Sequence, residues 1–333
     1  MVKNQIPLKI TDKNRELVIK LMTQPKISII VPVFREESNI KPFLQRVEKI
    51  VDKLNCTYEI IFCLDPSPDN TEQIILDEIV RNESIRLIKF SRRFGQPAAT
   101  LAGLHFCKGE VGIVIDVDLQ DPPELIEQMM KKWKEGYKVV YAKRNSPNGE
   151  TVLRRMISYV GYRVINKITD VSIPPDTGDF RLLDRRVIDE LKNLNESHGY
   201  LRGMVAFVGF KQTFVTYDRD ERSLGHTHYN RFYGSLTIPL NAITGFSIRP
   251  LQLASIIGGL IAGCGFLLGL WFLFERIVLH SELTPGLTWT IILITFLSGV
   301  QLLSLGIIGE YIGRIYEEVK HRPLYIVEKT ENF

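Results

Sequence analysis

Residues 26–33 have the sequence Lys26-Ile27-Ser28-Ile29-Ile30-Val31-Pro32-Val33, an apolar and β-branched run. A run of this length and composition predicts a buried strand. Apolar positions at helical spacing from about Asn39 to Leu54 predict a helix directly after it. The folded part of the chain therefore opens with a β-α unit.

The same alternation continues along the chain. It predicts strands over Tyr58 to Leu64, Ile85 to Phe90 and Val111 to Ile115, and helices over Thr71 to Val80 and Ala98 to Phe106. Strands that alternate with helices predict an α/β fold, in which a mostly parallel sheet carries helices on both faces. In such sheets ligands bind beyond the carboxyl ends of the strands.

Polar clusters follow the predicted strands, so the chemistry collects at one rim of the sheet. The clusters are Phe34-Arg35-Glu36-Glu37, Asp65-Pro66-Ser67-Pro68-Asp69, Ser91-Arg92-Arg93-Phe94-Gly95 and Asp116-Val117-Asp118. The first cluster contains no glycine, whereas a dinucleotide-binding fold has a glycine-rich turn at that place. Nicotinamide and flavin cofactors are therefore disfavoured.

Two carboxylates one residue apart, Asp116 and Asp118, follow the fourth predicted strand. Residues two apart on an extended chain point the same way, so both carboxylates can face one hard cation and the anion that it carries. This layout suits a metal-bound nucleotide diphosphate. The alternative at this point is a solvated acidic turn that ends a strand.

After Tyr141 the pattern becomes less regular. It contains Arg144, an amphipathic stretch from Thr151 to Ile168 and a polar turn over residues 175–181. We expect this half of the α/β domain to bind a second substrate.

Two long apolar stretches come next. No residue is charged from Pro250 to Phe274 or from Leu283 to Gly309, and each stretch exceeds the roughly 20 residues that cross a bilayer. We expect two transmembrane helices, and the alternative is a pair of buried core helices. The flanking basic residues place both chain ends in the cytoplasm by the positive-inside rule; they are Arg249 before the first stretch and Arg314, Lys320 and Arg322 after the second.

Composition restricts the class further. Residues 1–24 are polar and mixed in charge, so they predict no signal peptide. The four cysteines have no paired or metal-type spacing, which fits a reducing compartment. The net charge of +4 is too small to indicate nucleic-acid binding.

The combined motifs resemble the polyisoprenyl-phosphate glycosyltransferases. The resemblance rests on Pro32-Val33-Phe34-Arg35-Glu36-Glu37, the turn at Asp65, Asp116-Val117-Asp118-Leu119-Gln120-Asp121-Pro122-Pro123-Glu124 and Gly309-Glu310-Tyr311-Ile312-Gly313-Arg314-Ile315-Tyr316-Glu317-Glu318-Val319-Lys320. It covers about residues 26–327. Such proteins are inverting enzymes of glycosyltransferase family 2 with the GT-A fold, related to bactoprenol glucosyltransferases and dolichol-phosphate mannose synthases.

The resemblance implies transfer of one hexose from a nucleotide-diphosphate sugar to the phosphate of a membrane polyprenol, here undecaprenyl phosphate. It implies a Mg²⁺ or Mn²⁺ cofactor, held by Asp116, Asp118 and Gln120. It also implies a nucleotide site formed by Pro32, Phe34, Glu36, Glu37, Asp65 and Asp116. The chain departs from the family at Pro66 and Pro68, which stand in the turn after Asp65 and restrict its backbone.

The acceptor in such a reaction needs no general base. A phosphate monoester has a second pKa of about 6, so its oxygen is already an anion at neutral pH. Arginines, whose planar forks bind phosphate, would relieve the repulsion between the two substrates. We expect Arg144, Arg155 and Arg222 in this role, with Arg181, Asp176, Asp179, Thr227 and His228 at the acceptor or sugar. His228 stands where the family usually has lysine.

The expected organisation has six parts. They are an N-terminal extension (1–25), a catalytic domain (26–229), a juxtamembrane segment at the membrane interface (230–249), two transmembrane helices (250–274 and 283–309) and a cytoplasmic tail (310–333). An ordinary linker helix is the alternative for the juxtamembrane segment. Glycine pairs four residues apart permit close helix approach, between chains as a homo-oligomer or within the hairpin: Gly259 with Gly263, Gly265 with Gly269, and Gly309 with Gly313.

The expected location is the inner, cytoplasmic membrane. The best expectation for the donor is UDP-glucose, and GDP-mannose, a UDP-N-acetylhexosamine or a UDP-aminopentose are alternatives. A processive polysaccharide synthase is disfavoured because no Gln-x-x-Arg-Trp string occurs. A small lipid transporter is disfavoured because both apolar stretches lack charged residues. The intact Asp116-Asp118-Gln120 set disfavours a non-catalytic membrane partner that retains the fold, but Pro66 and Pro68 keep this other class open.

Overall fold

The computed structural model describes residues 26–145, 177–194, 196, 201–218, 247–278 and 286–333. Its elements are β1 (Ile27–Val33), α2 (Ile40–Leu54), β2 (Tyr58–Leu64), α3 (Thr71–Arg81), β3 (Ile85–Phe90), α4 (Gln96–Phe106), β4 (Val111–Val114), α5 (Leu125–Lys134), β5 (Val139–Arg144), β6 (Thr177–Asp184), α7 (Arg185–Asn193), α8 (Leu201–Val208), β7 (Gln212–Tyr217), α10 (Arg249–Val278), α11 (Leu287–Val319) and β8 (Val327–Glu331).

The described strands form one sheet in the order β7-β5-β6-β4-β1-β2-β3-β8. Strands β1 to β4 are parallel to one another, and β5 is parallel to β7. Strand β6 is antiparallel to both β4 and β5, so β5 and β7 run in the same direction as β1 to β4. The mostly parallel sheet of the predicted α/β fold is confirmed.

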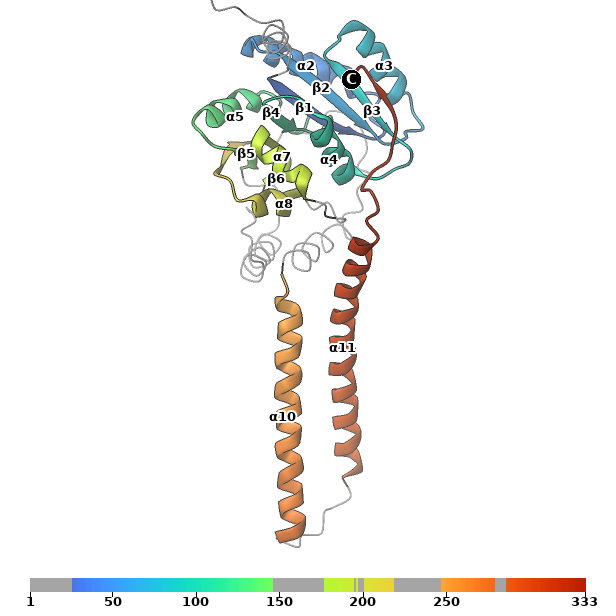
Figure 1. Cartoon of the computed structure of the whole chain (residues 1–333), viewed down its shortest axis with the longest axis vertical. Coiled ribbons are helices and arrows are strands. Elements are labelled where there is room, and N and C mark those ends of the chain that lie inside the picture. Colours follow the sequence, from blue (N-terminus) through green and yellow to red (C-terminus); the bar gives the residue numbers. More distant parts are fainter. Residues whose placement is uncertain (1–25, 146–176, 195, 197–200, 219–246, 279–285) are drawn as a thin grey trace, which may run out of the picture.

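Helices cover both faces of this sheet (Figure 1). Residues of α2, α3 and α5 pack into one apolar cluster with one set of strand side chains. Residues of α4, α7 and α8 form the second cluster with the opposite set. Helix α4 lies especially close to β1 because Gly103 has no side chain, and a Cβ there would be 2.2 Å from Cγ2 of Ile30. This close packing holds α4 against the sheet.

The polar turn expected over residues 175–181 is a strand from Thr177 onward. Strand β6 enters the middle of the sheet, where Phe180, Leu182 and Leu183 are buried. The expectation was wrong because the polar residues Thr177 and Asp179 obscure the apolar positions that follow.

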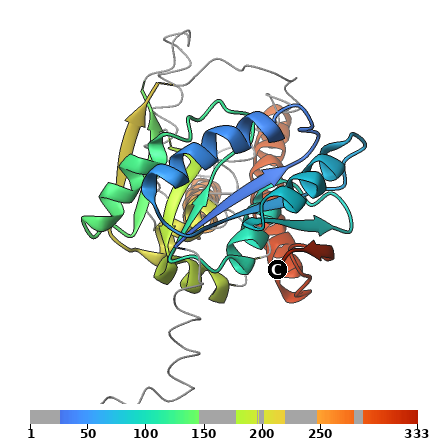
Figure 2. The same ribbon diagram turned by 90° about the horizontal axis from the view of Figure 1, so that it is seen from above.

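Two long helices, α10 and α11, extend side by side away from the α/β domain (Figure 1). In the view from above, the α/β domain lies in front of them (Figure 2). The segments Arg249–Leu268 and Phe296–Val319 are long and apolar enough to cross a membrane, and none of the side chains that the structure describes in them is buried within the chain. This exposure disfavours a pair of core helices. The hydroxyl of Tyr311 donates to the carbonyl of Ser247 at 2.6 Å, which joins α11 to the start of α10.

The glycine pairs of these helices do not bring α10 and α11 together. A Cβ placed on Gly259, Gly263, Gly265, Gly309 or Gly313 would meet no atom within 4 Å. Packing within the hairpin therefore gives no reason for these five glycines, and self-association stays a prediction.

The end of the chain belongs to the sheet. Helix α11 continues past Gly309, the expected end of the second span, to Val319. After residues 320–326 the chain forms β8, which pairs antiparallel with β3 at the edge of the sheet. The residues expected as a cytoplasmic tail thus contain three further turns of α11 and a strand of the α/β domain.

Candidate active site

One rim of the sheet carries most of the predicted site. Strands β1 to β5 and β7 all end there, and the antiparallel β6 begins there, because Thr177 pairs with Lys143. The rim therefore brings together the last residues of six strands, the residues that follow them and the first residues of β6. They include Phe34, Asp65, Asp116, Asp118, Arg144, Asp179 and Tyr217.

Asp116 lies at the centre of this rim, after β4. Its Oδ1 accepts a hydrogen bond of 2.7 Å from the side-chain amide of Gln96, the first residue of α4. Burial, followed by the nearby carboxylates of Asp179, Asp118 and Asp121, raises the pKa of Asp116 from 3.8 to about 8. Negative charge thus exceeds the positive charge that the described part of the rim supplies to Asp116.

The turn after β4 is held in an uncommon backbone conformation. Leu119 has a φ of 58°, a region that residues other than glycine rarely adopt. Its side chain is buried, and the backbone N–H of Gln120 donates to Oδ1 of Asp118 at 3.2 Å. Non-glycine residues with such angles are frequent where a backbone must be fixed for function. Here the turn sets where Asp118 and Gln120 lie.

The same turn is fastened to strands β5 and β7. The hydroxyl of Tyr217 donates a short hydrogen bond to Oδ1 of the buried Asp121. Arg144 in turn donates from Nε to the Tyr217 oxygen at 3.1 Å, and its Nη2 is 3.6 Å from Asp121 Oδ1. The three side chains thereby fix the end of β5 against the Asp116–Asp121 turn.

Asp179, at the start of β6, is bound by two arginines. Its Oδ1 accepts from Nη2 of Arg181 at 3.1 Å and from Nε of Arg202 at 3.0 Å. Burial alone would raise the pKa of Asp179, but Arg202 and Arg181 hold it below its ordinary value. Arg181 itself is completely buried and also donates to the carbonyl of Gly178, so it supports the start of β6.

The donor set at the rim fits a divalent cation that is shared with a substrate. Asp116, Asp118 and Gln120 offer hard oxygen ligands of the kind that Mg²⁺ and Mn²⁺ prefer. Within the described residues, no group of three or more histidine, cysteine, aspartate or glutamate side chains could hold a metal by itself. Asp116, Asp118 and Gln120 leave coordination positions of a six-coordinate cation open for further oxygens, such as those of a diphosphate. Burial and then the three neighbouring carboxylates raise the pKa of Asp116, and a bound cation would offset this negative charge.

The loops after β1, β2 and β3 form the neighbouring part of the rim. The guanidinium of Arg93 lies 4.0 Å from the ring centre of Phe34, and that of Arg35 lies 5.2 Å from it. Asp65 is buried, and its two oxygens accept from the backbone N–H groups of Phe94 and Gly95, each at 2.9 Å. The turn that contains Pro66 thus holds the loop after β3 through a side chain rather than through its own backbone.

Three other predicted nucleotide residues also have structural contacts. Pro32 is buried within β1. Glu36 accepts from the side-chain amide of Asn39 at 2.6 Å, and Glu37 accepts from the backbone N–H of Asn70 at 3.0 Å. Their role in nucleotide binding stays a prediction.

The remaining predicted residues lie outside the described part of the chain: Arg155, Asp176, Arg222, Thr227 and His228. The structure adds four residues that sequence reasoning missed, which are Gln96, Asp121, Arg202 and Tyr217. Asp121 stood within the recognised motif, and only the other three had no sequence signal.

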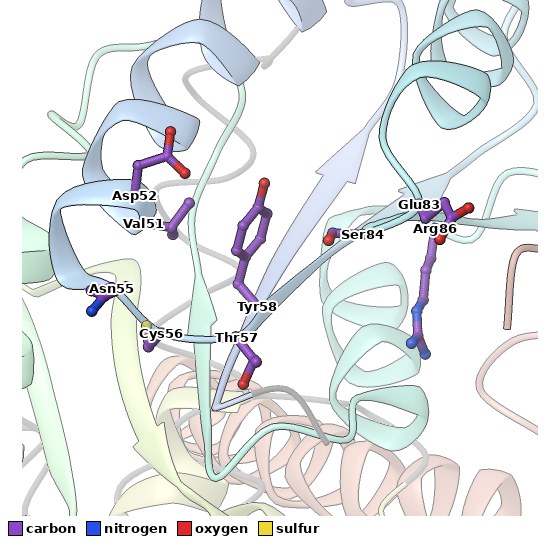
Figure 3. Close-up of a pocket in the computed structure, with 9 residues that line it drawn as sticks. All are labelled: Val51, Asp52, Asn55, Cys56, Thr57, Tyr58, Glu83, Ser84 and Arg86. Carbon is purple, nitrogen blue, oxygen red and sulfur yellow. The ribbon is translucent and has the colours of Figure 1, made fainter. Parts of the chain in front are cut away.

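A separate pocket of about 600 Å³ lies at the opposite end of the sheet (Figure 3). It is lined by the end of α2 and by the first residues of β2 and β3, including Asn55, Tyr58 and Arg86. The strands run from this end toward Asp116, so this pocket is not part of the rim.

Comparisons with known proteins identify the family to which the chain belongs. Residues 28–192 match the family model described as glycosyl transferase family 2. An uncharacterized glycosyltransferase of Bacillus subtilis, YkcC, is 46% identical over 303 residues, which cover 91% of this chain and 93% of that protein. The chain belongs to glycosyltransferase family 2, and it is a glycosyltransferase with the GT-A fold.

Other relatives are similar along almost their whole length. The SfII prophage-derived bactoprenol glucosyl transferase of Shigella flexneri is 38% identical over 305 residues, covering 92% of this chain and 98% of that protein. Among solved structures, mannosyl-3-phosphoglycerate synthase from Rubrobacter xylanophilus has a TM-score of 0.49 and 14% identity, covering 74% of this chain and 79% of that one. This distant structural likeness adds nothing to the family assignment.

The contacts of Tyr217 lead to a first prediction. Tyr217→Phe removes the hydroxyl that joins Asp121 to Arg144 but retains the ring. We expect sugar transfer to fall roughly tenfold, since one buried charge-assisted hydrogen bond is lost on each side of the hydroxyl. The metal concentration for half-maximal rate should rise as the Asp116–Asp121 turn loosens. Tyr58→Phe, at the far end of the sheet, is the control, and an unchanged metal dependence in Tyr217→Phe would contradict the prediction.

The pKa of Asp116 leads to a second prediction. Since a cation displaces the proton from this carboxyl, Mn²⁺ should bind roughly tenfold or more tightly at pH 8.5 than at pH 6.5. The stability of the metal-free chain should change in the opposite direction and decrease as the pH rises. A pKa of about 8 in the folded state and 3.8 in the unfolded state stabilises the fold at low pH, and this contribution is lost as the pH rises toward 8. Titration with Mn²⁺ and thermal unfolding, each at several pH values, measure both effects. Equal Mn²⁺ affinity at the two pH values would contradict the assignment.

Proposed function

We propose that the chain transfers a single glucose from UDP-glucose to the phosphate of undecaprenyl phosphate, at the cytoplasmic face of the membrane. The name of the Shigella relative, a bactoprenol glucosyl transferase, supports both the sugar and the lipid acceptor. The single observation that carries the proposal is the direction in which the rim faces.

This direction follows from the pairing of β8 with β3. Val327, the first residue of β8, pairs with Phe90, the last residue of β3, and only residues 320–326 separate it from the end of α11. The carboxyl end of β3 is therefore on the side of α11. Since β1, β2 and β4 are parallel to β3, their carboxyl ends face the same way. The Asp116 rim thus faces the helices that are long enough to cross a membrane.

A rim in this orientation suits an acceptor whose phosphate lies at a bilayer surface. The acceptor phosphate arrives as an anion, so it can attack the anomeric carbon of the sugar without a general base. Direct attack from the face opposite the leaving diphosphate inverts the anomeric configuration. The protein then has to align two phosphate-bearing substrates and reduce their repulsion.

The described residues divide this work. Asp116, Asp118 and Gln120 would hold a Mg²⁺ or Mn²⁺ ion, which neutralises charge on the departing diphosphate when bound. Arg144 keeps a positive charge at the end of β5, next to this position, and Tyr217 and Asp121 fix its direction. Asp179, whose carboxylate Arg181 and Arg202 bind at the same rim, would hold the sugar.

The proposal includes the arrangement in the membrane. Helices α10 and α11 cross the bilayer as a hairpin, and both chain ends and residues 26–229 lie in the cytoplasm. The distribution of lysine and arginine supports this orientation. Arg276 is the single such residue between the charge-free stretches, whereas Arg249 precedes the first stretch and Arg314, Lys320 and Arg322 follow the second. Residues 230–249 lie at the interface, and homo-oligomers form through the glycine pairs.

The test is sugar transfer into lipid. Membranes that carry the chain are supplied with undecaprenyl phosphate, Mg²⁺ or Mn²⁺, and radiolabelled UDP-glucose, GDP-mannose, UDP-N-acetylglucosamine or a UDP-aminopentose in turn. We expect label in the organic phase with UDP-glucose, and its loss on chelation of the metal. Label from another donor would replace glucose in the proposal. No label from any donor, with the protein folded, would favour a non-catalytic partner.

A further inference from the structure

We infer that β8 and residues 320–326 determine acceptor specificity, because they hold the catalytic rim at a fixed distance from the membrane. The inference rests on the proposed function and concerns which acceptor the enzyme prefers. A rim held in this way favours a phosphate anchored in the bilayer over the same phosphate free in water.

The first observation is that the connection from α11 to the sheet is short. Helix α11 runs without a break through the charged residues after Gly309 to Val319, which adds about 15 Å at 1.5 Å per residue. Residues 320–326 then lead directly to β8. The second connection to the long helices, from Tyr217 to Arg249, contains many more residues. The path through β8 is therefore the shorter constraint on the rim.

The second observation is that β8 is fastened at both ends. Near its start, the hydroxyl of Tyr325 is 2.9 Å from Nδ1 of His105, and its ring packs on Phe90 with centres 5.8 Å apart. Near its end, the side-chain amide of Asn332 donates to the carbonyls of Glu83 and Ile85 at 2.7 and 2.8 Å. These contacts add to the backbone pairing of the five-residue strand β8. They attach the segment that follows α11 firmly to the sheet.

The third observation is that β8 meets the loop that supports the site. The backbone N–H of Ser91 donates to the carbonyl of Ile326 at 3.0 Å. Ser91 begins the loop after β3, and Asp65 binds the backbone of Phe94 and Gly95 in that loop. Gln96, which follows, donates to Asp116. A continuous series of hydrogen-bonded segments therefore joins the end of α11 to the centre of the rim.

The physical consequence is a difference between two kinds of acceptor. A lipid phosphate is confined to the bilayer surface, so it reaches the sugar only when the rim is held at the matching distance and angle. Small errors in such placement can reduce a rate by as much as about a hundredfold. A short-chain prenyl phosphate dissolved in water approaches from any direction and does not depend on this distance.

The experiment inserts a Gly-Ser linker of about 12 residues, with a mean span of about 20 Å, between Arg322 and Pro323 of the full-length chain. The insertion leaves α11 and β8 intact. The control is the same linker between His280 and Ser281, in the connection between α10 and α11. Glucose transfer from UDP-glucose is measured to undecaprenyl phosphate in liposomes and to citronellyl phosphate in solution.

The quantity that tests the inference is the ratio of the lipid rate to the soluble rate. We expect the insertion after Arg322 to lower this ratio about tenfold, with the soluble rate unchanged, and the control insertion to leave it unaltered. An unaltered ratio after Arg322 would overturn the inference. An equal fall of both rates would also overturn it, because β8 would then support the catalytic fold and not the choice of acceptor. Absence of transfer by the unmodified chain to either acceptor would count instead against the proposed function.

Discussion

Asp118→Asn is expected to lower glucose transfer by roughly a thousandfold, since loss of one anionic metal ligand removes several kcal/mol of charge stabilisation at the departing diphosphate. Asparagine has the same size and can still accept the hydrogen bond from the backbone of Gln120, so the turn around Leu119 should persist. Initial rates with saturating UDP-glucose, over a range of Mn²⁺ concentrations, measure the effect.

A second aspartate provides the control for this experiment. Asp52→Asn makes the same chemical change on the exposed end of α2, beside the pocket at the opposite end of the sheet. It should transfer glucose at the unmodified rate. If Asp118→Asn were within a few-fold of the unmodified enzyme at all Mn²⁺ concentrations, the assignment of a metal to the Asp116–Asp118 pair would be wrong.

Arg144→Ala is expected to lower the rate of glucose transfer about a hundredfold. Removing one positioned group that stabilises an oxyanion has an effect of this size in other enzymes. The substitution removes a positive charge beside the Asp116–Asp121 turn and also removes a partner of Tyr217 and Asp121. Arg144→Lys should recover only a small part of the rate, because lysine cannot reproduce the planar fork. Rates are measured as a function of both the donor and the acceptor concentration.

The neighbouring residue on β5 offers a matched control. Lys143 alternates with Arg144 along the strand, and its amino group lies 5.1 Å from the ring centre of Phe214. Lys143→Ala removes the same charge from the opposite side of the strand, and we expect little change in rate. Equal losses in the two variants would indicate that the basic charge of the whole edge matters, and not the position of Arg144.

The first half of the fold was predictable because its strands are short apolar runs bounded by polar turns. The predicted strands Tyr58 to Leu64 and Ile85 to Phe90 have the observed bounds, and the others differ by one residue. Strand β8 was not predictable in this way. Its sequence, Val327-Glu328-Lys329-Thr330-Glu331, is polar because it covers an edge that faces solvent, and such a strand has no apolar pattern to detect.

The acidic centre of the site was predictable for a similar reason, and its supports were not. Strand alternation predicts that Asp116 and Asp118 face the same way. In the structure β4 already ends at Val114, and Asp118 lies in the turn that follows. Gln96, Arg202 and Tyr217 come from α4, α8 and β7, and only the three-dimensional order of the strands brings them near. The β7-β5-β6-β4 part of this order depends on an antiparallel strand that no local pattern identifies.

The pairing of β8 with β3 also has a consequence for how the protein is made. Asn332 and Ile85, which the pairing brings together, are 247 residues apart in the chain. The ribosome therefore completes both α10 and α11 before it releases the strand that covers β3. Until that moment β3 is an open edge, which other chains can pair with during synthesis. In the membrane arrangement proposed above, the whole hairpin is synthesised before the sheet can close, so a delay in its insertion would prolong the exposure of this edge and favour aggregation of the nascent protein.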